Sequence, residues 1–281
     1  MRAVIVALGL LLLGCPRGPA SEGALRVVQA EQVIAAPAAG RVVIDVRPAE
    51  AFAAGHVPGA VHLDVKALRA EVDGVAEQLA PRASVAAVLG ALGVDPGDEV
   101  IVVDEGSTPA AARVVWTLLY FGHPPARVRM LDGGWAAWVA AKGPVSAGAA
   151  EVVESEGAAV GEARPELRVD AAWVLAHLGD PQVLLVDVRS DEEWSAGRIP
   201  GAQHVEWKRA RGADGRLLAE PGLRELYARA LASPTVAVYC KSGMRASLTW
   251  LVLATLGHPD VRVYDGSWNE WGARPELPKE G

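Results

Sequence analysis

Short apolar runs alternate along most of the chain with longer stretches that have helical spacing. Residues 42–45 and 184–187 are apolar runs that end in aspartate, a pattern typical of strands buried on both faces. Similar runs predict strands over 99–104, 128–131, 235–240 and 261–264. Residues 110–122 and 245–257 have helical spacing and end at glycine, which often follows a helix C-terminus. This alternation predicts α/β domains with mainly parallel sheets, right-handed crossovers and helices on both faces of each sheet.

One sequence unit occurs twice in the chain. Residues 42–62, VVIDVRPAEAFAAGHVPGAVH, match residues 184–204, LLVDVRSDEEWSAGRIPGAQH, at an offset of 142. The stretches 100–138 and 235–271 also match, through a Gly-His pair and an Asp-Gly pair followed by two tryptophans. Two copies predict two domains of the same fold, which we place at 24–143 and 166–275. The small, acidic stretch 144–165 between them is interpreted as a linker.

Composition narrows the class of protein. The 281 residues suit two domains, and 51% hydrophobic with 22% charged residues excludes a disordered chain. A net charge of −7 without any basic block makes nucleic-acid binding a poor hypothesis. The two cysteines, Cys15 and Cys240, are too few for a disulfide-stapled fold or a cysteine-rich metal site. The histidines also lack metal-ligand spacing, so we expect no metal.

The N-terminal residues 1–15, MRAVIVALGLLLLGC, read as a signal peptide. Their twelve apolar or glycine residues are fewer than the roughly 20 needed to span a bilayer. The ending Leu-Leu-Gly-Cys resembles a bacterial lipobox, in which cleavage precedes a cysteine that is then lipidated. We therefore expect Cys15 to be lipidated and 16–23 to be a tether, although an ordinary signal peptide is the alternative. The protein would be exported to the periplasmic or cell-surface side, with the lipid anchor as its only membrane contact.

The second cysteine stands where a predicted strand meets a predicted helix. Cys240 ends the strand, and the tight loop after it leads into the helix N-terminus, which presents backbone N–H groups and a positive dipole to an anion. Two cations in the loop favour a thiolate, and Gly243 permits the curvature. Although a free cysteine is often buried and inert, α/β sheets bind ligands at this place. We interpret Cys240 as a nucleophile, with an anion-binding loop formed by Lys241, Ser242, Gly243, Met244 and Arg245.

These motifs resemble those of tandem-domain rhodaneses, a family of sulfurtransferases, over residues 25–272. The resemblance is carried by DVRPAEAFAAGHVPGA, LDGGWAAW, DVRSDEEWSAGRIPGA, YCKSGMR and YDGSWNEW. It implies that Cys240 takes sulfane sulfur from a small anionic donor such as thiosulfate. The resulting persulfide would pass the sulfur to a thiophilic acceptor, cyanide or a thiol. The resemblance implies no metal and no organic cofactor.

The first copy departs from the second at the decisive position. Asp104 stands where Cys240 stands, and a carboxylate cannot carry a persulfide. We therefore expect the first domain to be an inactive scaffold that packs against the second. We also expect Asp187 and Arg189 of the DVR motif to form a structural pair that supports the active loop.

The loop leaves the sulfur donor open. At Arg245 the loop resembles the loop of thiosulfate-using rhodaneses, whereas at Ser242 it resembles the loop of the mercaptopyruvate branch. That branch pairs its loop serine with an Asp and a His of the first domain, where this chain has Asp64 and Gln78. Glu193 stands where thiosulfate-type tandem enzymes carry a substrate arginine. Thiosulfate, 3-mercaptopyruvate and persulfides or polysulfides are all open as donors.

Two other functions compete with sulfur transfer. One is a non-enzymatic module that senses sulfide or redox state or serves as a docking surface, although the complete loop disfavours it. The other is an oxyanion phosphatase or reductase. Related cysteine phosphatases have five residues between cysteine and arginine, whereas four residues separate Cys240 from Arg245.

Overall fold

The computed structural model describes residues 26–36, 40–149 and 160–281. Cys15, the predicted signal peptide and the tether 16–23 lie outside these residues, as do residues 150–159 of the predicted linker. Within the described ranges, no helix has the length and apolar character needed to cross a membrane.

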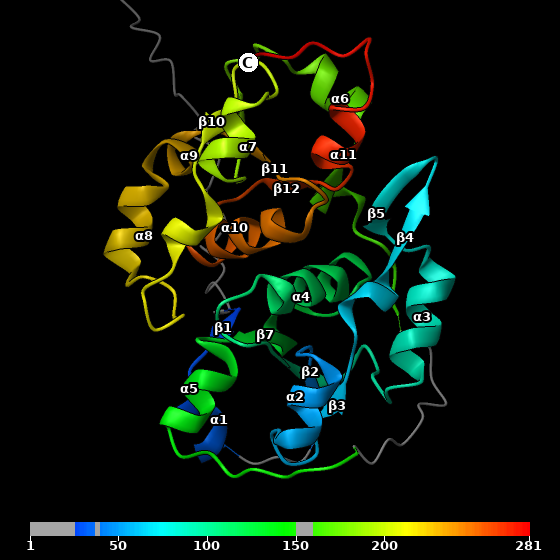
Figure 1. Ribbon diagram of the computed structural model, residues 1–281, viewed down its shortest axis with the longest axis vertical. Coiled ribbons are helices and arrows are strands. Elements are labelled where there is room, and N and C mark those ends of the chain that lie inside the picture. Colours follow the sequence, from blue (N-terminus) through cyan, green and yellow to red (C-terminus); the bar gives the residue numbers. More distant parts are fainter. Residues whose placement is uncertain (1–25, 37–39, 150–159) are drawn as a thin grey trace, which may run out of the picture.

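The first domain is built on a five-stranded parallel sheet with the strand order β1-β7-β6-β2-β3 (Figure 1). A two-stranded antiparallel hairpin, β4-β5, projects from it. Its elements are β1 Val27–Val28, α1 Ala30–Ala35, β2 Arg41–Asp45, α2 Ala49–Ala54, β3 Val61–His62, η1 Val65–Leu68, β4 Arg69–Val72, β5 Val75–Leu79, α3 Arg82–Gly90, β6 Glu99–Val103, α4 Ala110–Tyr120, η2 Pro125–Arg127, β7 Val128–Leu131 and α5 Gly134–Ala140.

The second domain repeats this sheet with the order β10-β9-β11-β12-β8, also parallel throughout. Its elements are η3 Pro165–Leu167, β8 Arg168–Val169, α6 Ala171–Ala176, β9 Val183–Asp187, α7 Asp191–Ser195, β10 Gln203–His204, η4 Trp207–Ala210, α8 Glu220–Leu226, α9 Ala228–Ala232, β11 Thr235–Tyr239, α10 Met244–Thr255, β12 Val261–Tyr264 and α11 Ser267–Trp271. The predicted fold class, two tandem α/β domains with parallel sheets, is confirmed.

The central strands are buried on both faces, as their continuous apolar sequence predicts. In β11, Val236 and Val238 face one hydrophobic core, whereas Ala237 and Tyr239 face another on the opposite side of the sheet. The first of these cores continues into domain 1, because α4 and α10 pack against each other between the two sheets (Figure 1). The domains therefore share one core, which holds the loop before α10 close to domain 1.

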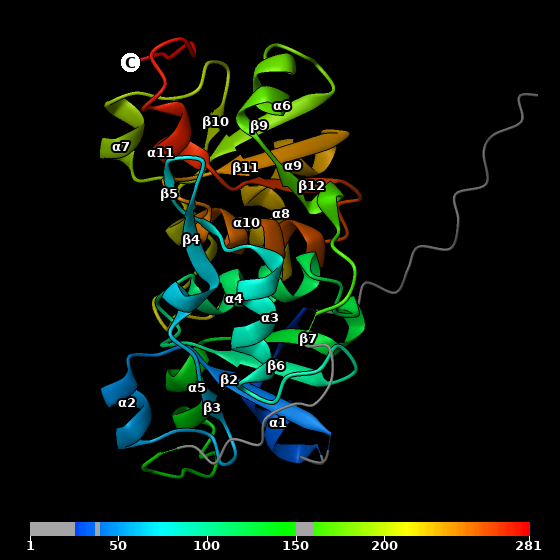
Figure 2. The same cartoon turned by 90° about the vertical axis from the view of Figure 1, so that its right-hand side faces the viewer.

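Each domain also sends a segment across to the other. The β4-β5 hairpin reaches α11 of domain 2 (Figure 2), and the N–H of Leu79 donates to the Asp265 carboxylate at 2.7 Å. In the opposite direction, the N–H of Leu217 donates to Asp132 at 2.9 Å. Asp132 and Asp265 are the aspartates of the two Asp-Gly repeats. The duplication has thus produced a pair of reciprocal contacts between the domains.

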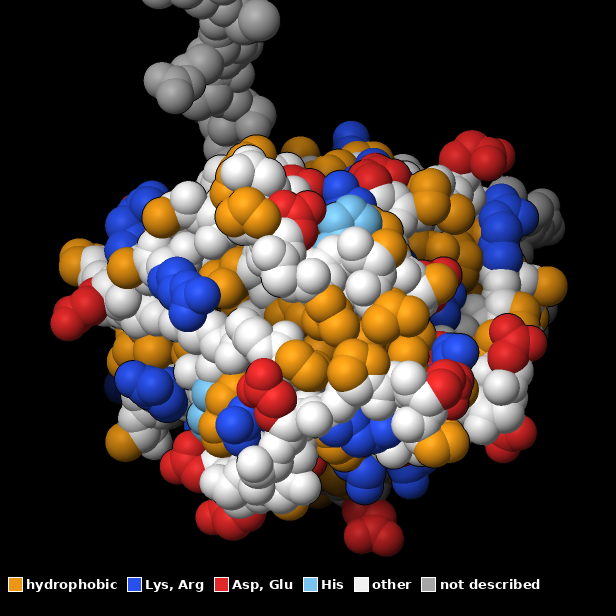
Figure 3. Space-filling model, turned by 90° about the horizontal axis from the view of Figure 1, so that it is seen from above, with side chains coloured by type: hydrophobic (Ala, Val, Ile, Leu, Met, Phe, Trp, Pro, Cys, Tyr) orange, Lys and Arg blue, Asp and Glu red, His pale blue; other side chains and the backbone are white. Residues whose placement is uncertain are grey.

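The outer face of domain 2, seen from above, carries an apolar area with Lys, Arg, Asp and Glu side chains scattered around it (Figure 3). Basic side chains on this face are interspersed with acidic ones. This face therefore lacks the continuous basic stripe that is typical of nucleic-acid binding.

Candidate active site

Cys240 lies directly after β11, and α10 begins four residues later at Met244. Gly243 is the N-cap residue and has a φ of +75°, in the left-handed region that favours glycine. A Cβ at this position would lie 2.6 Å from an Asp265 oxygen and 2.8 Å from an Arg113 nitrogen. The loop therefore rests directly on these two side chains and has no room for a larger residue.

Below Gly243, the Arg113 guanidinium of α4 donates to the Asp265 carboxylate at 2.7 Å, and both side chains are fully buried. Asp265 also accepts from the N–H of Leu79 and lies 3.4 Å from Arg168. A buried ion pair between the domains thus forms the floor beneath the candidate catalytic loop.

The Cys240 side chain is 0% exposed. The backbone N–H groups of Cys240 and Gly243 both donate to the Ser267 hydroxyl at 3.1 Å, and that hydroxyl donates to the Tyr264 carbonyl at 2.7 Å. From the sequence, the N–H groups of the loop were expected to surround one bound anion. For the N–H groups of Cys240 and Gly243 this expectation is wrong. Their acceptor is a side chain of the protein itself.

Other N–H groups of the loop remain available to an anion. Those of Lys241, Ser242, Met244 and Arg245 form no hydrogen bond to any described residue. Met244 and Arg245 belong to the first turn of α10, where backbone donors have no partner within the helix. Lys241 is exposed, whereas Ser242 is buried. The helix N-terminus next to Cys240 can therefore still receive negative charge.

Arg245 is already bound by a carboxylate. Its two terminal nitrogens lie 2.5 Å and 2.9 Å from the two oxygens of Glu193, a bidentate ion pair. The Arg245 guanidinium lowers the pKa of Glu193 to about 2. The Arg245 pKa is raised in turn, chiefly by Glu193 and further by the Cys240 sulfur. Arg245 therefore interacts with both the candidate nucleophile and the carboxylate of Glu193.

Domain 1 contributes a second cation to the loop. Arg69, at the start of the β4-β5 hairpin, donates to the Ser242 hydroxyl at 2.9 Å and pairs with Glu77 at 3.2 Å. The comparison with the mercaptopyruvate branch suggested Asp64 and Gln78 as partners of Ser242. Asp64 instead accepts from the backbone at the start of η1, and Gln78 bonds within the hairpin and to an arginine of domain 2. The domain 1 side chain that contacts Ser242 is Arg69.

Asp187 and Arg189 form a buried ion pair at 2.5 Å, and the Arg189 guanidinium stacks 4.4 Å from the centre of the Trp268 ring. Asp45 and Arg47 form the same pair in domain 1, at 2.7 Å. Because the pair also occurs in the domain without the cysteine, it serves the fold of each copy. Its support of the active loop stays a prediction.

In domain 1, the Asp104 carboxylate accepts hydrogen bonds from the loop that corresponds to the Cys240 loop. Asp104 accepts from the N–H groups of Gly106 at 2.7 Å and Ala111 at 3.2 Å, and from the Thr108 hydroxyl at 3.1 Å. Arg211 of domain 2 donates to two carbonyls of this loop. Burial is the largest influence on the Asp104 pKa and raises it, against the lowering effect of Arg211. The Asp104 carboxylate thus occupies the hydrogen-bond donors that a bound anion would need.

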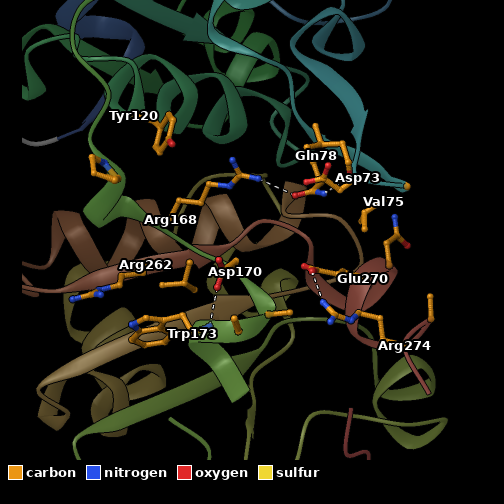
Figure 4. Close-up of a pocket in the computed structure, with 18 residues that line it drawn as sticks. Asp73, Val75, Gln78, Tyr120, Arg168, Asp170, Trp173, Arg262, Glu270 and Arg274 are labelled. Carbon is orange, nitrogen blue, oxygen red and sulfur yellow. Dashed lines mark hydrogen bonds and ion pairs between the residues drawn. The ribbon is translucent and has the colours of Figure 1, made fainter. Parts of the chain in front are cut away.

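A cavity of about 970 Å³ opens between the hairpin and domain 2. Gln78 and Arg168 bond across it, with Asp170, Trp173 and Glu270 on the domain 2 side (Figure 4). None of residues 240–245 lines it. The described residues contain no group of three or more His, Cys, Asp or Glu that could hold a metal ion.

Replacing Ser267 by alanine is expected to destabilise the loop, because two buried N–H groups lose the one acceptor that they have among the described residues. The expected loss is about 2–4 kcal/mol in the free energy of unfolding, since each unpaired buried donor costs about 1–3 kcal/mol. Urea denaturation measures it. The control is Ser195→Ala, an exposed hydroxyl that donates to a carbonyl of its own helix. An equal, small loss in both variants would contradict the role given to Ser267.

Sequence reasoning missed Ser267, Arg69 and Arg113, but two of them left a signal. Ser267 stands where domain 1 has Gly134, and it keeps a φ of +51°, which a non-glycine residue rarely adopts. Arg69 matches Arg211 at the offset of the repeat, and each reaches the loop of the opposite domain. Arg113 left no such signal, because no matching arginine stands in α10.

Comparison with known proteins agrees with this geometry. A family model described as "Rhodanese-like domain" matches residues 29–141 and 170–274. The chain is 32% identical over 245 residues to a 3-mercaptopyruvate sulfurtransferase of Escherichia coli, covering 83% of this chain and 85% of that one. It is 29% identical over 250 residues to a thiosulfate sulfurtransferase of Azotobacter vinelandii, covering 85% and 90%.

Solved structures are also similar to this chain. The crystal structure of SseA from Escherichia coli, described as a 3-mercaptopyruvate sulfotransferase, superimposes with a TM-score of 0.77 at 30% identity, over 86% of this chain and 98% of that one. An anaerobic ergothioneine biosynthesis enzyme from Chlorobium limicola gives 0.82 at 25% identity, over 92% of this chain and 71% of that longer one. The chain therefore belongs to the rhodanese family, with two rhodanese-like domains in tandem, and it is an enzyme of the sulfurtransferase class.

Proposed function

We propose that the protein transfers sulfane sulfur through a persulfide on Cys240. The observation that carries this proposal is the position of Cys240, between β11 and the N-terminus of α10 and next to the Arg245 guanidinium. In the first half-reaction the Cys240 thiolate attacks the sulfur that is transferred, which is the outer sulfur of thiosulfate or the thiol sulfur of 3-mercaptopyruvate. A sulfur–sulfur bond forms to Cys240, and the bond between that sulfur and the rest of the donor breaks.

The balance of this step depends on the donor. With thiosulfate, the electron pair of the broken bond leaves with sulfite. With 3-mercaptopyruvate it leaves with the carbon, which takes up the thiol proton to give pyruvate. In the second half-reaction an acceptor, cyanide or a thiolate, attacks the outer sulfur and restores the Cys240 thiolate. Arg245 and the free N–H groups of the loop balance the negative charge of the persulfide.

In this proposal domain 1 supports the Cys240 loop of domain 2. Its equivalent loop holds Asp104, so we assign it no half-reaction of its own. It contributes Arg69, which holds Ser242, and Arg113, which underlies Gly243. The relatives named 3-mercaptopyruvate and thiosulfate sulfurtransferases support both compounds as donors to test.

The test is a steady-state assay with cyanide as the acceptor. The wild-type protein is offered thiosulfate or 3-mercaptopyruvate, and the formation of thiocyanate is followed. We expect saturable, enzyme-dependent formation from at least one donor. A protein that is folded and reduced but forms no thiocyanate from either, and also takes no sulfur from an organic persulfide, would contradict the proposal and favour a non-enzymatic binding module.

We also propose that the protein is exported and held to a bacterial membrane by a lipid on Cys15. This rests on the sequence Leu-Leu-Gly-Cys after the apolar segment. The mass of the N-terminal peptide from the membrane fraction tests it. A peptide that begins elsewhere than at a lipidated Cys15 would contradict it.

A further inference from the structure

An ion pair between Arg245 and Glu193 lies beside the buried Cys240. Cys240 is buried, and the Arg245 guanidinium that interacts with it has a side chain only 20% exposed. Glu193, which binds both terminal nitrogens of that guanidinium, is 33% exposed. Of the two partners, the Glu193 carboxylate is therefore the more accessible to a donor in solution.

Glu193 is held in this position by its own helix. Its carboxylate accepts from the N–H of Ser190 at 3.2 Å, while the Ser190 hydroxyl accepts from the Glu193 N–H at 3.3 Å. This capping box forms the start of α7. One oxygen of the carboxylate, Oε2, accepts from both the Ser190 N–H and Arg245, and the other, Oε1, accepts from Arg245 alone, so the backbone of α7 and Arg245 together limit how far the carboxylate can move.

The bidentate contact with Glu193 occupies the two terminal nitrogens of Arg245. A planar guanidinium binds two oxygens of a carboxylate or of a sulfur oxyanion with the same fork geometry. Glu193 thus fills the place on Arg245 that an oxygen-bearing anionic donor would use. Because the carboxyl pKa is lowered to about 2, the group is ionised throughout the pH range in which the protein would be assayed.

We propose that Glu193 determines which sulfur donors the enzyme accepts. Its carboxylate occupies Arg245 as an internal anion, which selects against a donor with two negative charges, such as thiosulfate. It favours a donor whose sulfur end carries at most one charge, such as an organic persulfide. This inference rests on the proposed sulfur transfer and adds the substrate class to it.

The two donors differ in the charge that they bring to Glu193. In both reactions the Cys240 thiolate forms a bond to the outer sulfur. Thiosulfate carries two charges into the site and releases sulfite, which keeps both. An organic persulfide enters uncharged as R–S–SH or with one charge as R–S–S⁻, and its sulfur–sulfur bond breaks to release R–S⁻. Its outer sulfur stays on Cys240, with the proton when the uncharged form reacts. Repulsion from Glu193 therefore raises the barrier more for thiosulfate.

The experiment measures the rate constant for sulfur transfer to Cys240 with each donor. Wild type, Glu193→Gln and Glu193→Asp are mixed with thiosulfate or with 2-hydroxyethyl persulfide and quenched. The mass of the peptide that contains Cys240 is then followed over time. For Glu193→Gln we expect the thiosulfate rate constant to rise about tenfold, which corresponds to about 1.4 kcal/mol, while the persulfide rate constant stays within about threefold. Glu193→Asp keeps the charge and should stay close to wild type with thiosulfate.

The matched control is Glu192→Gln. Glu192 is the neighbouring carboxylate in the first turn of α7, and it makes no ion pair with Arg245. Its replacement removes the same charge and should leave both rate constants within about twofold of wild type. Thermal unfolding of all four proteins shows that each is folded at the assay temperature.

Two results would overturn the inference while sulfur transfer itself stands. One is a Glu193→Gln protein that gains no more with thiosulfate than Glu192→Gln does. The other is an equal gain with both donors, which would mean that Glu193 only obstructs the entrance. If no variant and no donor places sulfur on Cys240, the proposed function itself fails.

Discussion

Cys240→Ser is expected to abolish sulfur transfer from every donor. Serine keeps the shape of the side chain, but its hydroxyl is not ionised at neutral pH and cannot hold a persulfide. A loss of activity to the level of the uncatalysed reaction is therefore expected in the thiocyanate assay. The folded structure should remain, because the buried site already contains polar partners in the N–H groups of the loop. We expect a loss of about 1–2 kcal/mol in the free energy of unfolding, measured with urea.

Cys240→Ala is the control for this variant. It removes the nucleophile without adding a polar atom to the core that Cys240 joins. Both variants should be equally inactive, although their stabilities differ. Residual transfer in either one, above the rate without protein, would mean that another group carries the sulfur.

The second large effect is expected from the buried ion pair between the domains. Arg113→Leu leaves the Asp265 carboxylate buried without its main partner, although Arg168 lies 3.4 Å away. Removal of one member of a buried pair costs about 3–5 kcal/mol in the free energy of unfolding. Because Gly243 rests on the same two side chains, the variant should also lose sulfur transfer.

The matched control is Arg224→Leu. Arg224 pairs with Glu220 one turn earlier on α8, and both side chains are mostly exposed. An exposed pair of this kind contributes about 0.3–0.5 kcal/mol. Arg113→Leu with Asp265→Asn should recover part of the stability, since the buried charge is then removed. A single variant Arg113→Leu that is no less stable than Arg224→Leu would show that the pair does not hold the domains together.

The fold could be predicted because its strongest signals are local. The expected strands at 128–131 and 261–264 coincide with β7 and β12. The expected helices at 110–122 and 245–257 each lie within two residues of α4 and α10. Continuous apolar runs, glycines after helices and the internal repeat are all contained in short stretches of sequence. They determine the elements and the order in which they alternate.

The contacts of the site could not be predicted because they join distant residues. Arg69 and Ser242 are 173 positions apart, and Arg113 and Asp265 are 152 apart. Glu193 departs from the family pattern in the sequence itself, but its bond to Arg245 is visible only in the three-dimensional structure. The same holds for Ser267, whose hydroxyl takes two N–H groups that the loop sequence alone would assign to a substrate.

The most direct test of the account is the mass of the Cys240 peptide after brief exposure of the reduced protein to a sulfur donor. The wild-type peptide should gain the mass of one sulfur atom and lose it again when cyanide is added. The same treatment of Cys240→Ser should leave the mass unchanged. A wild-type protein whose Cys240 is reduced and accessible to the donors, yet never gains sulfur from thiosulfate, 3-mercaptopyruvate or an organic persulfide, would contradict the account.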